Sequence, residues 1–262
     1  MKIVVCAKQV PDTTEVRIDP VTHTMIRDGV PSILNPEDAN ALEEALRIKD
    51  KNPDTTVVVL TMGPPQAGVM LRECLAMGAD ESVLLSDRAF AGADTWATAN
   101  ALASAIRAIG DVDLVLVGRQ AIDGDTAQVG PQIAERLGLP QVTYVRKLTV
   151  GQGGRLTVER QLEQGYEVLE VQTPALLSAV KELNTPRYLS ILGICEAYEK
   201  EIKTLTINDL DITAEDTGLK ASPTKVYRTF TPGTEREGIV WNDSADQMAT
   251  NLMAALKEKH VL

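Results

Sequence analysis

Residues 118–130, GRQAIDGDTAQVG, hold the densest set of potential ligand-binding groups in this 262-residue sequence. Glycines allow a backbone to approach a ligand closely, and Thr126 and Gln128 offer neutral hydrogen-bonding groups at a helix start. Asp123 and Asp125 would repel a phosphate, so we expect them to accept ribose hydroxyls or to cap the helix. Spacing alone favours a simpler alternative, an ordinary capped loop between a strand and a helix.

A second group lies at a helix start, in the run Asp94-Thr95-Trp96-Ala97-Thr98. Asp94 is a suitable N-cap, and Thr95 and Thr98 lie one turn apart. Hydroxyls and free backbone amides at such a place can hold a diphosphate, although Asp or Thr also begins many helices that bind nothing. The sequence has neither GxGxxG nor GxxxxGK[ST], which argues against a standard dinucleotide fingerprint and against a P-loop NTPase.

Side chains able to carry out a reaction by themselves are scarce. The only histidines are His23 and His260, which argues against a Ser-His-Asp or Cys-His triad. Cys6, Cys74 and Cys195 are far apart and form no CxxC pair, so we expect neither a disulfide framework nor a zinc or iron–sulfur site. We infer a reduced, cytoplasmic protein whose chemistry belongs to something that it binds.

Composition narrows the class further. The 26 Lys and Arg against 37 Asp and Glu give a net charge of −11, and aromatic residues make up only 3%. Such a chain repels nucleic-acid backbones and anionic membranes and lacks a base-stacking platform. The N-terminus has no signal-peptide pattern, and no apolar run is long enough to span a membrane. We expect no nucleic-acid partner and no membrane insertion.

The elements that position these groups alternate between strands and helices. Continuous apolar strands separated by helices predict an α/β fold with a doubly wound, mostly parallel sheet and helices on both faces. We expect strands at 2–7, 56–62, 82–86 and 113–117, a polar hairpin at 15–26, and helices starting after Asn35, ending near Gly78, and at 95–109 and 128–137. In such a sheet, ligands bind at the carboxyl ends of strands, so residues 6–8, 61–64, 87–98 and 118–130 are the candidates.

The remainder of the chain differs in character. Turn residues at 151–154 predict a β-hairpin extension, and further strands are expected at 166–171 and 175–180. Residues 184–238 show little periodicity, as expected of an arm lying on a partner. Ser244 and Gln247 form a capping box ahead of an amphipathic helix, which could pack on its own domain but by position favours a partner. We therefore predict a nucleotide-binding domain at 1–183 and a partner-recognition loop with a C-terminal arm at 184–262.

Several segments, taken in order along most of the chain, resemble the β subunit of electron-transfer flavoproteins. They are VCAKQVPD at 5–12, NPED at 35–38, MGPPQ at 62–66, LRECLAMGAD at 71–80, residues 118–131 and NTPRY at 184–188. The resemblance implies a heterodimer with a larger α subunit and an adenine nucleotide bound by this chain. The implied nucleotide-binding residues are Cys6, Asn35, Met62, Gly118, Arg119, Asp123, Gly124, Asp125, Thr126, Ala127, Gln128 and Val129.

Two runs resemble the electron-bifurcating branch of that family, GDTAQVGP at 124–131 and ADTWAT at 93–98. This likeness implies that the nucleotide is FAD, with Asp94, Thr95 and Thr98 at its pyrophosphate. The flavin would take a hydride from NADH and divide the electrons between ferredoxin and the α-subunit FAD. The alternative is the housekeeping type, in which AMP is bound as a scaffold for a single FAD in the α subunit. A third reading, from the residues alone, is an adenylating or ATP-sensing domain, but no lysine-bearing phosphate motif supports it.

The stretch after Tyr188 resembles the family's partner-recognition loop. Ile191 or Leu192 would be the apolar anchor into a flavin dehydrogenase of the acyl-CoA or hydroxy-acid type. Housekeeping members continue with a lysine cluster, whereas this sequence reads EAYEKE at 196–201, which predicts a different docking partner. Arg119 is the candidate for a positive charge beside the cofactor, and a surface salt bridge is its alternative role.

Overall fold

The computed structural model describes residues 1–12, 31–227 and 238–262. Contacts divide the chain into two compact units, Met1–Tyr227 and Arg228–Leu262, which are considered separately below. The hairpin expected at 15–26 lies outside the described residues.

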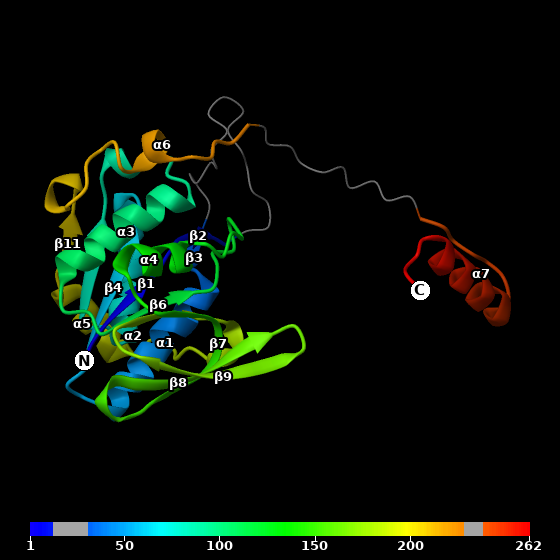
Figure 1. Ribbon diagram of the computed structural model, residues 1–262, viewed down its shortest axis with the longest axis horizontal. Coiled ribbons are helices and arrows are strands. Elements are labelled where there is room, and N and C mark those ends of the chain that lie inside the picture. The colour runs from blue at the N-terminus through cyan, green and yellow to red at the C-terminus, as the bar shows by residue number, and fades with distance from the viewer. Residues whose placement is uncertain (13–30, 228–237) are drawn as a thin grey trace. The chain divides into compact units, whose positions relative to one another are not determined.

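The first unit is built on a nine-stranded sheet with the order β11-β5-β4-β1-β6-β10-β7-β8-β9 (Figure 1). Its strands are β1 (Lys2–Cys6), β4 (Thr56–Met62), β5 (Glu81–Leu85), β6 (Leu114–Gly118), β7 (Gln141–Val150), β8 (Arg155–Leu162), β9 (Gly165–Gln172), β10 (Ala175–Ala179) and β11 (Ile202–Leu205). All pairs from β11 to β7 are parallel, and β8 and β9 extend the sheet as antiparallel strands. A small separate sheet pairs β2 (Gln9–Pro11) with β3 (Ser32–Leu34).

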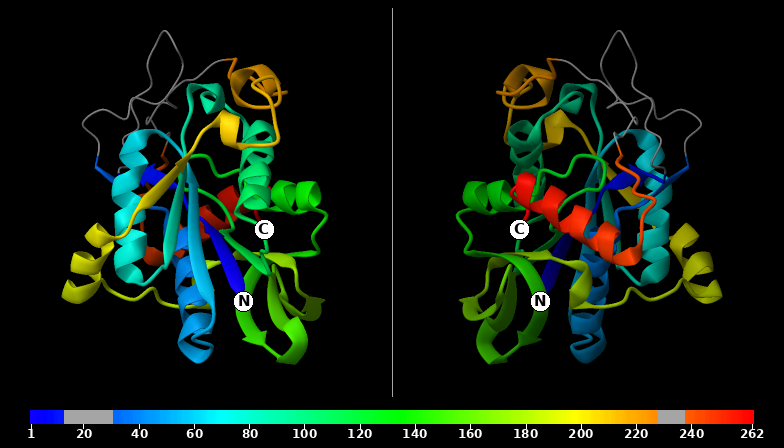
Figure 2. Two further views of the ribbon diagram at one scale, coloured as in Figure 1. Left: turned by 90° about the vertical axis from the view of Figure 1, so that its left-hand side faces the viewer. Right: turned by 90° about the vertical axis from the view of Figure 1, so that its right-hand side faces the viewer.

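Helices cover both faces of this sheet (Figure 2). On one face lie α1 (Pro36–Lys51), α2 (Gly68–Met77) and α5 (Ile191–Glu199), and on the other α3 (Thr95–Ile109) and α4 (Val129–Leu137). The central strands are apolar on both sides: Ile3 and Val5 of β1 join one buried cluster, and Val4 joins the other. Burial on both faces explains why these strands are continuous β-branched runs without alternation. The predicted α/β class, with its doubly wound sheet and hairpin extension, is confirmed.

Residues 184–227 contain more regular structure than their sequence indicates. Besides α5, they form β11, which pairs in parallel with β5, and the short helix α6 (Gly218–Ala221) against α3. β11 has only four residues, which is too short to show a periodic pattern of apolar residues. Only Leu205 among them is buried, so the strand also lacks a run of buried apolar side chains. This segment thus belongs to the first compact unit, while its proposed role toward a partner stays a prediction.

The second unit contains α7 (Ala245–Glu258), the amphipathic helix expected from the capping box. Ser244 caps it by accepting a hydrogen bond from the backbone N–H of Gln247 at 3.4 Å. Within this unit the apolar side chains of Met248, Leu252 and Met253 are exposed. No helix in the three described ranges is long and apolar enough to cross a membrane.

Candidate functional site

The sequence candidates Cys6, Met62 and Gly118 lie at the ends of three neighbouring strands. β1 is the central one, paired with β4 on one side and with β6 on the other, and Cys6 is in register with Leu60 and Val117. The chain passes from β1 to β4 in one direction and later returns to β6 in the other. This is the topological switch point of a doubly wound sheet, where ligands bind in such folds.

The first turn of α1 holds the loop that follows β6. Asn35, fully buried just before α1, donates from its amide to the carbonyl of Gln120 at 2.9 Å and accepts from the N–H of Ile122 at 3.1 Å. Glu37 accepts from the N–H of Gln120 at 3.1 Å. Asn35 occupies the N-cap position that the sequence predicts, but its side chain makes no capping hydrogen bond to the backbone of α1. It braces the loop instead.

Asp38 ties two strand ends together. Its carboxylate accepts from the backbone N–H of Lys8 at 2.8 Å and of Gly118 at 3.0 Å. Burial raises the pKa of Asp38 to about 7, against the lowering effect of these hydrogen bonds and one from Asn35. Gly118 is required here, because a Cβ at this residue would lie 2.8 Å from the backbone nitrogen of Asp38. Sequence reasoning explained this glycine by ligand approach alone; its close neighbour is α1.

The charge of Asp123 is matched within the loop. Both of its carboxylate oxygens accept from Lys8 Nζ, at 2.7 and 2.8 Å, and its side chain is only 7% exposed. Asp125 is exposed and accepts from the side-chain amide of Gln120 at 2.8 Å. The expectation that one of these aspartates caps the following helix is wrong, since Gln128 stands at the N-cap of α4. Because Lys8 neutralises Asp123, the loop repels an anionic ligand less than its sequence indicates.

Arg119 makes the salt bridge that was its alternative role, while its role beside a cofactor stays a prediction. Its guanidinium lies 3.1 Å from Glu37 in an ion pair and 5.6 Å from the ring centre of Tyr144. Its Nε is buried without a partner among the described residues. Burial raises the pKa of Glu37 despite this pairing. The residue therefore makes a structural salt bridge and keeps one hydrogen-bond donor unused.

The far end of the loop meets the second sequence motif. The Thr95 hydroxyl, at the start of α3, donates to the Gln128 side-chain oxygen at 3.0 Å. Between these points the loop is open: Gly124 has no neighbouring atom where a Cβ would stand, and Thr126 is exposed. Ala127 and Asp125 have left-handed backbones, with φ of 53° and 49°. Such conformations are uncommon in residues with a Cβ and often occur at functional sites.

The remaining predicted residues frame this region. Asp94 is the N-cap of α3, accepting from the N–H of Ala97 at 3.0 Å, and it also accepts from Thr224, at 3.0 Å from the backbone and 2.8 Å from the hydroxyl. Burial alone would raise the pKa of Asp94, but these hydrogen bonds outweigh it and lower the pKa. Thr98 lies one turn further on and is half-buried, as are Met62 at the end of β4 and Val129 at the start of α4.

The cysteine at the strand ends is not a reactive group. Burial, reinforced by the nearby Asp38 charge, raises the pKa of the Cys6 thiol to about 12, so it is protonated at neutral pH. Burial first, and then the charges of Glu73 and Asp38, raise the pKa of Cys74. Within the described ranges no cluster of three or more His, Cys, Asp or Glu side chains could hold a metal ion.

Ile191 and Leu192 lie apart from this loop, on α5, which packs against α2. Their exposed fractions are 85% and 67%. Sequence reasoning missed Asp38 as part of the first site, and it included Lys8 in the candidate run 6–8 without predicting its pairing with Asp123. Both residues stand inside the quoted runs VCAKQVPD and NPED. The sequence signal that could have indicated a role for Asp38 is a second carboxylate, next to Glu37, in the first turn of a helix.

Comparison with known proteins places this arrangement in a family. The family model described as "Electron transfer flavoprotein domain" matches residues 22–210. The chain is 60% identical over 263 residues to the caffeyl-CoA reductase-Etf complex subunit CarD of Acetobacterium woodii, and 56% identical over 262 residues to the electron transfer flavoprotein subunit beta of Clostridium acetobutylicum. It is 44% identical over 270 residues to the acryloyl-CoA reductase electron transfer subunit gamma of Anaerotignum propionicum. Each match covers the whole of both chains. This chain belongs to the electron transfer flavoprotein family and is of its β-subunit type.

Proposed function

We propose that this chain binds FAD at the carboxyl ends of β1, β4 and β6, as the β subunit of a heterodimer with a larger α subunit. Bound FAD would supply the redox chemistry, namely hydride acceptance from NADH and single-electron transfer to a low-potential acceptor such as ferredoxin and to the α-subunit FAD, which would serve a partner dehydrogenase. The described side chains hold and orient the cofactor.

One observation carries this proposal: the hydrogen bond from Thr95 to Gln128 joins the starts of α3 and α4. Two helix N-termini meeting at one place bring together the positive ends of two helix dipoles, which favours a diphosphate. Asp94 already caps α3 by accepting from the N–H of Ala97, so the backbone amides proposed for the ligand are those at the start of α4. Thr98 adds a neutral hydroxyl donor, and the Thr95 hydroxyl can donate to a ligand by exchanging its bond to Gln128. Lys8 offsets the negative charge of Asp123. In this proposal the loop at 118–129, with Cys6, Asn35 and Met62, holds the adenine nucleotide, and the start of α3 holds the pyrophosphate that FAD adds.

The partner class follows from the relatives. Two of them are named as subunits of caffeyl-CoA and acryloyl-CoA reductase systems. We extend this to an acyl-CoA-type flavin dehydrogenase as the partner of this chain, with a hydroxy-acid dehydrogenase as the other candidate.

The docking surface proposed for that dehydrogenase surrounds Ile191 and Leu192. The exposed apolar side chains beside them are those of Tyr188, Leu189, Ile194 and Tyr198. Exposed carboxylates from Glu196, Glu199 and Glu201 flank this patch. An apolar patch flanked by acidic groups fits a partner pocket rimmed by lysine or arginine.

The decisive experiment identifies the cofactors released from the purified α/β heterodimer. Two FAD per heterodimer, with bleaching of flavin absorbance on anaerobic NADH titration, are the expected results. One FAD together with one AMP would overturn the proposal and establish the scaffold alternative. A heterodimer with two FAD that NADH fails to bleach would retain the binding site but refute the hydride step.

A further inference from the structure

The docking helix α5 has almost no apolar anchorage of its own. Of its nine residues only Ala197 is buried, at 1% exposure. A helix of this length is unstable alone in water, and most helices in proteins are stabilised by burying an apolar face. Because Ile191 and Leu192 point their apolar surface outward, some other interaction must fix the orientation of α5.

The contacts at the C-terminal half of α5 are polar. Arg72 of α2 donates to the carbonyl of Ala197 at 2.5 Å and to that of Lys200. The Lys200 ammonium donates to the carbonyl of Ala79 at 2.7 Å. In the first turn, Gly193 packs so closely on α2 that a Cβ would collide with the carbonyl oxygen of Ala76. These contacts hold the helix against α2 but do not hold the segment that leads into it.

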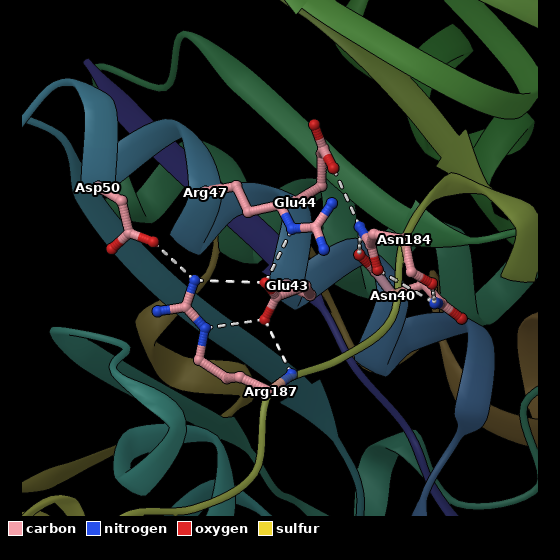
Figure 3. A network of polar contacts seen from close by, with 7 residues as sticks. All are labelled: Asn40, Glu43, Glu44, Arg47, Asp50, Asn184 and Arg187. Carbon is pink, nitrogen blue, oxygen red and sulfur yellow. Dashed lines mark hydrogen bonds and ion pairs between the residues drawn. The ribbon is translucent and has the colours of Figure 1, made fainter.

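That segment, residues 184–188, is held by the middle of α1 (Figure 3). Asn184 donates to the carbonyl of Asn40 and to the Glu44 carboxylate, both at 3.0 Å, and the Asn40 amide donates back to the Asn184 carbonyl at 2.8 Å. The side-chain amide of each asparagine therefore donates to the backbone carbonyl of the other. The exchange fixes where the chain leaves the sheet.

Arg187 makes the most specific contact of the network. Its Nε donates to Glu43 at 2.8 Å, its Nη2 donates to Asp50 at 2.8 Å, and its backbone N–H donates to Glu43 at 3.1 Å (Figure 3). Glu43 is 5% exposed. Burial alone would raise its pKa, but hydrogen bonds from Arg187 and from Arg47 outweigh this and lower it. A buried, charged carboxylate that receives two guanidinium groups is a firm, directional anchor.

We propose that Arg187 is a positioning residue for the docking surface: by binding Glu43 and Asp50 of α1 it sets the entry of α5, four residues before Ile191. This proposal rests on the docking role proposed above for Ile191 and Leu192. An entry segment fixed in advance lowers the ordering entropy that a partner would otherwise have to overcome.

A native thiol offers a direct test. Cys195 is exposed on α5, whereas Cys6 and Cys74 are buried. A maleimide nitroxide on the intact heterodimer will therefore label α5 within this chain, and C195S gives the background from the α subunit. We expect a single slow-motion electron paramagnetic resonance spectrum for the wild type and a fast-motion component for R187Q.

R47Q is the matched control, because Arg47 binds the same carboxylate at 2.9 Å but lies on α1 itself. Its spectrum should equal that of the wild type. Equal spectra for R187Q and R47Q would overturn the proposal. Where R187Q does not yield a folded heterodimer, R187K, which keeps the charge but cannot reach both carboxylates in a fork, is judged by the same criterion.

A kinetic readout separates this proposal from the docking role. With an acyl-CoA dehydrogenase that accepts electrons from the wild-type heterodimer, R187Q should raise the KM for the heterodimer about tenfold and leave kcat unchanged. A raised label mobility with an unaltered KM would keep Arg187 as the anchor of α5 but place docking elsewhere. A fall in kcat without a change in KM would contradict the positioning role.

Discussion

Asp38 shows how much one side chain can organise at this site. It is buried and accepts backbone hydrogen bonds from Gly118 at the end of β6 and from Lys8, two residues after β1. A protonated carboxyl in this position is favoured by burial, while the ionised form is favoured by its donors, and burial prevails. The geometry of the strand ends therefore depends on a group that titrates near neutrality.

The stability of the chain should consequently depend on the protonation of Asp38. Its pKa is about 7 when folded, against an ordinary value of 3.8, so between these values the folded chain holds a proton that the unfolded chain releases. The contribution of protonated Asp38 to the free energy of unfolding is complete below pH 3.8. It is lost as the pH rises through the folded-state pKa of about 7, at up to about 1.4 kcal/mol per pH unit. In D38N, thermal unfolding measured from pH 5 to 8 should lack this slope, while D54N, at an exposed carboxylate, should keep it. Parallel profiles for D38N and wild type would refute the assignment.

Thr95 and Thr98 provide the residue-level test of the cofactor. Replacing both by valine removes two hydroxyl donors at the start of α3 and keeps the side-chain shape, so FAD affinity should fall about tenfold or more. Flavin retained after gel filtration of the T95V/T98V heterodimer measures this, and T149V, exposed on the β-hairpin, is the control. Full flavin occupancy in the double variant would place the diphosphate elsewhere.

Among the elements, α1 and β6 approach each other at one glycine. A Cβ at Gly118 would lie 2.8 Å from backbone atoms of α1, which cannot move aside as a flexible side chain can. G118A should therefore displace the start of α1 from the loop, costing about 1–3 kcal/mol of stability and weakening cofactor retention. Chemical unfolding and flavin content report the two effects. G238A, where a Cβ meets no atom within 4 Å, should change neither, and a G118A protein as stable as wild type would contradict the close approach.

The elements also show which parts of the fold the sequence can predict. Long apolar strands such as Thr56–Met62 and the capped helix Thr95–Ile109 are predictable, because their local pattern and their burial agree. The edge strand β11 is not predictable, because it has four residues and its pairing with β5 is a tertiary interaction. The same limit applies to the site. The loop at 118–130 is visible in its residue types, whereas its anchoring by Asn35 and Asp38 depends on how α1 lies against β6.

For the whole molecule, we expect the unit Met1–Tyr227 to bind the cofactor and the unit Arg228–Leu262 to bind the α subunit. A chain ending at Tyr227 retains the complete sheet and α5, so it should fold. Without α7, whose apolar side chains are exposed among the described residues of its unit, it should not retain the α subunit. Affinity purification of the truncated chain with a co-expressed α subunit measures this. Recovery of the α subunit at the wild-type yield would show that residues 228–262 are dispensable for assembly.

Docking is likewise a property of the assembled molecule. Changing Ile191 and Leu192 to serine removes two exposed apolar side chains at the centre of the proposed patch. We expect a higher KM for electron transfer to an acyl-CoA dehydrogenase, with cofactor content and unfolding temperature unchanged. V168S, at an exposed apolar residue on β9, is the comparison. Identical kinetics for the two variants would exclude this face as the docking surface.

Helix α1 contacts both the proposed cofactor loop and the segment that leads into α5. Asp38, which gathers the strand ends, and Glu43, which receives Arg187, are five residues apart on one rod, about 7.5 Å along its axis. With the roles proposed above, a change that tilts α1 should therefore alter flavin retention and docking together. Evolution of either proposed trait through α1 should then be coupled to evolution of the other.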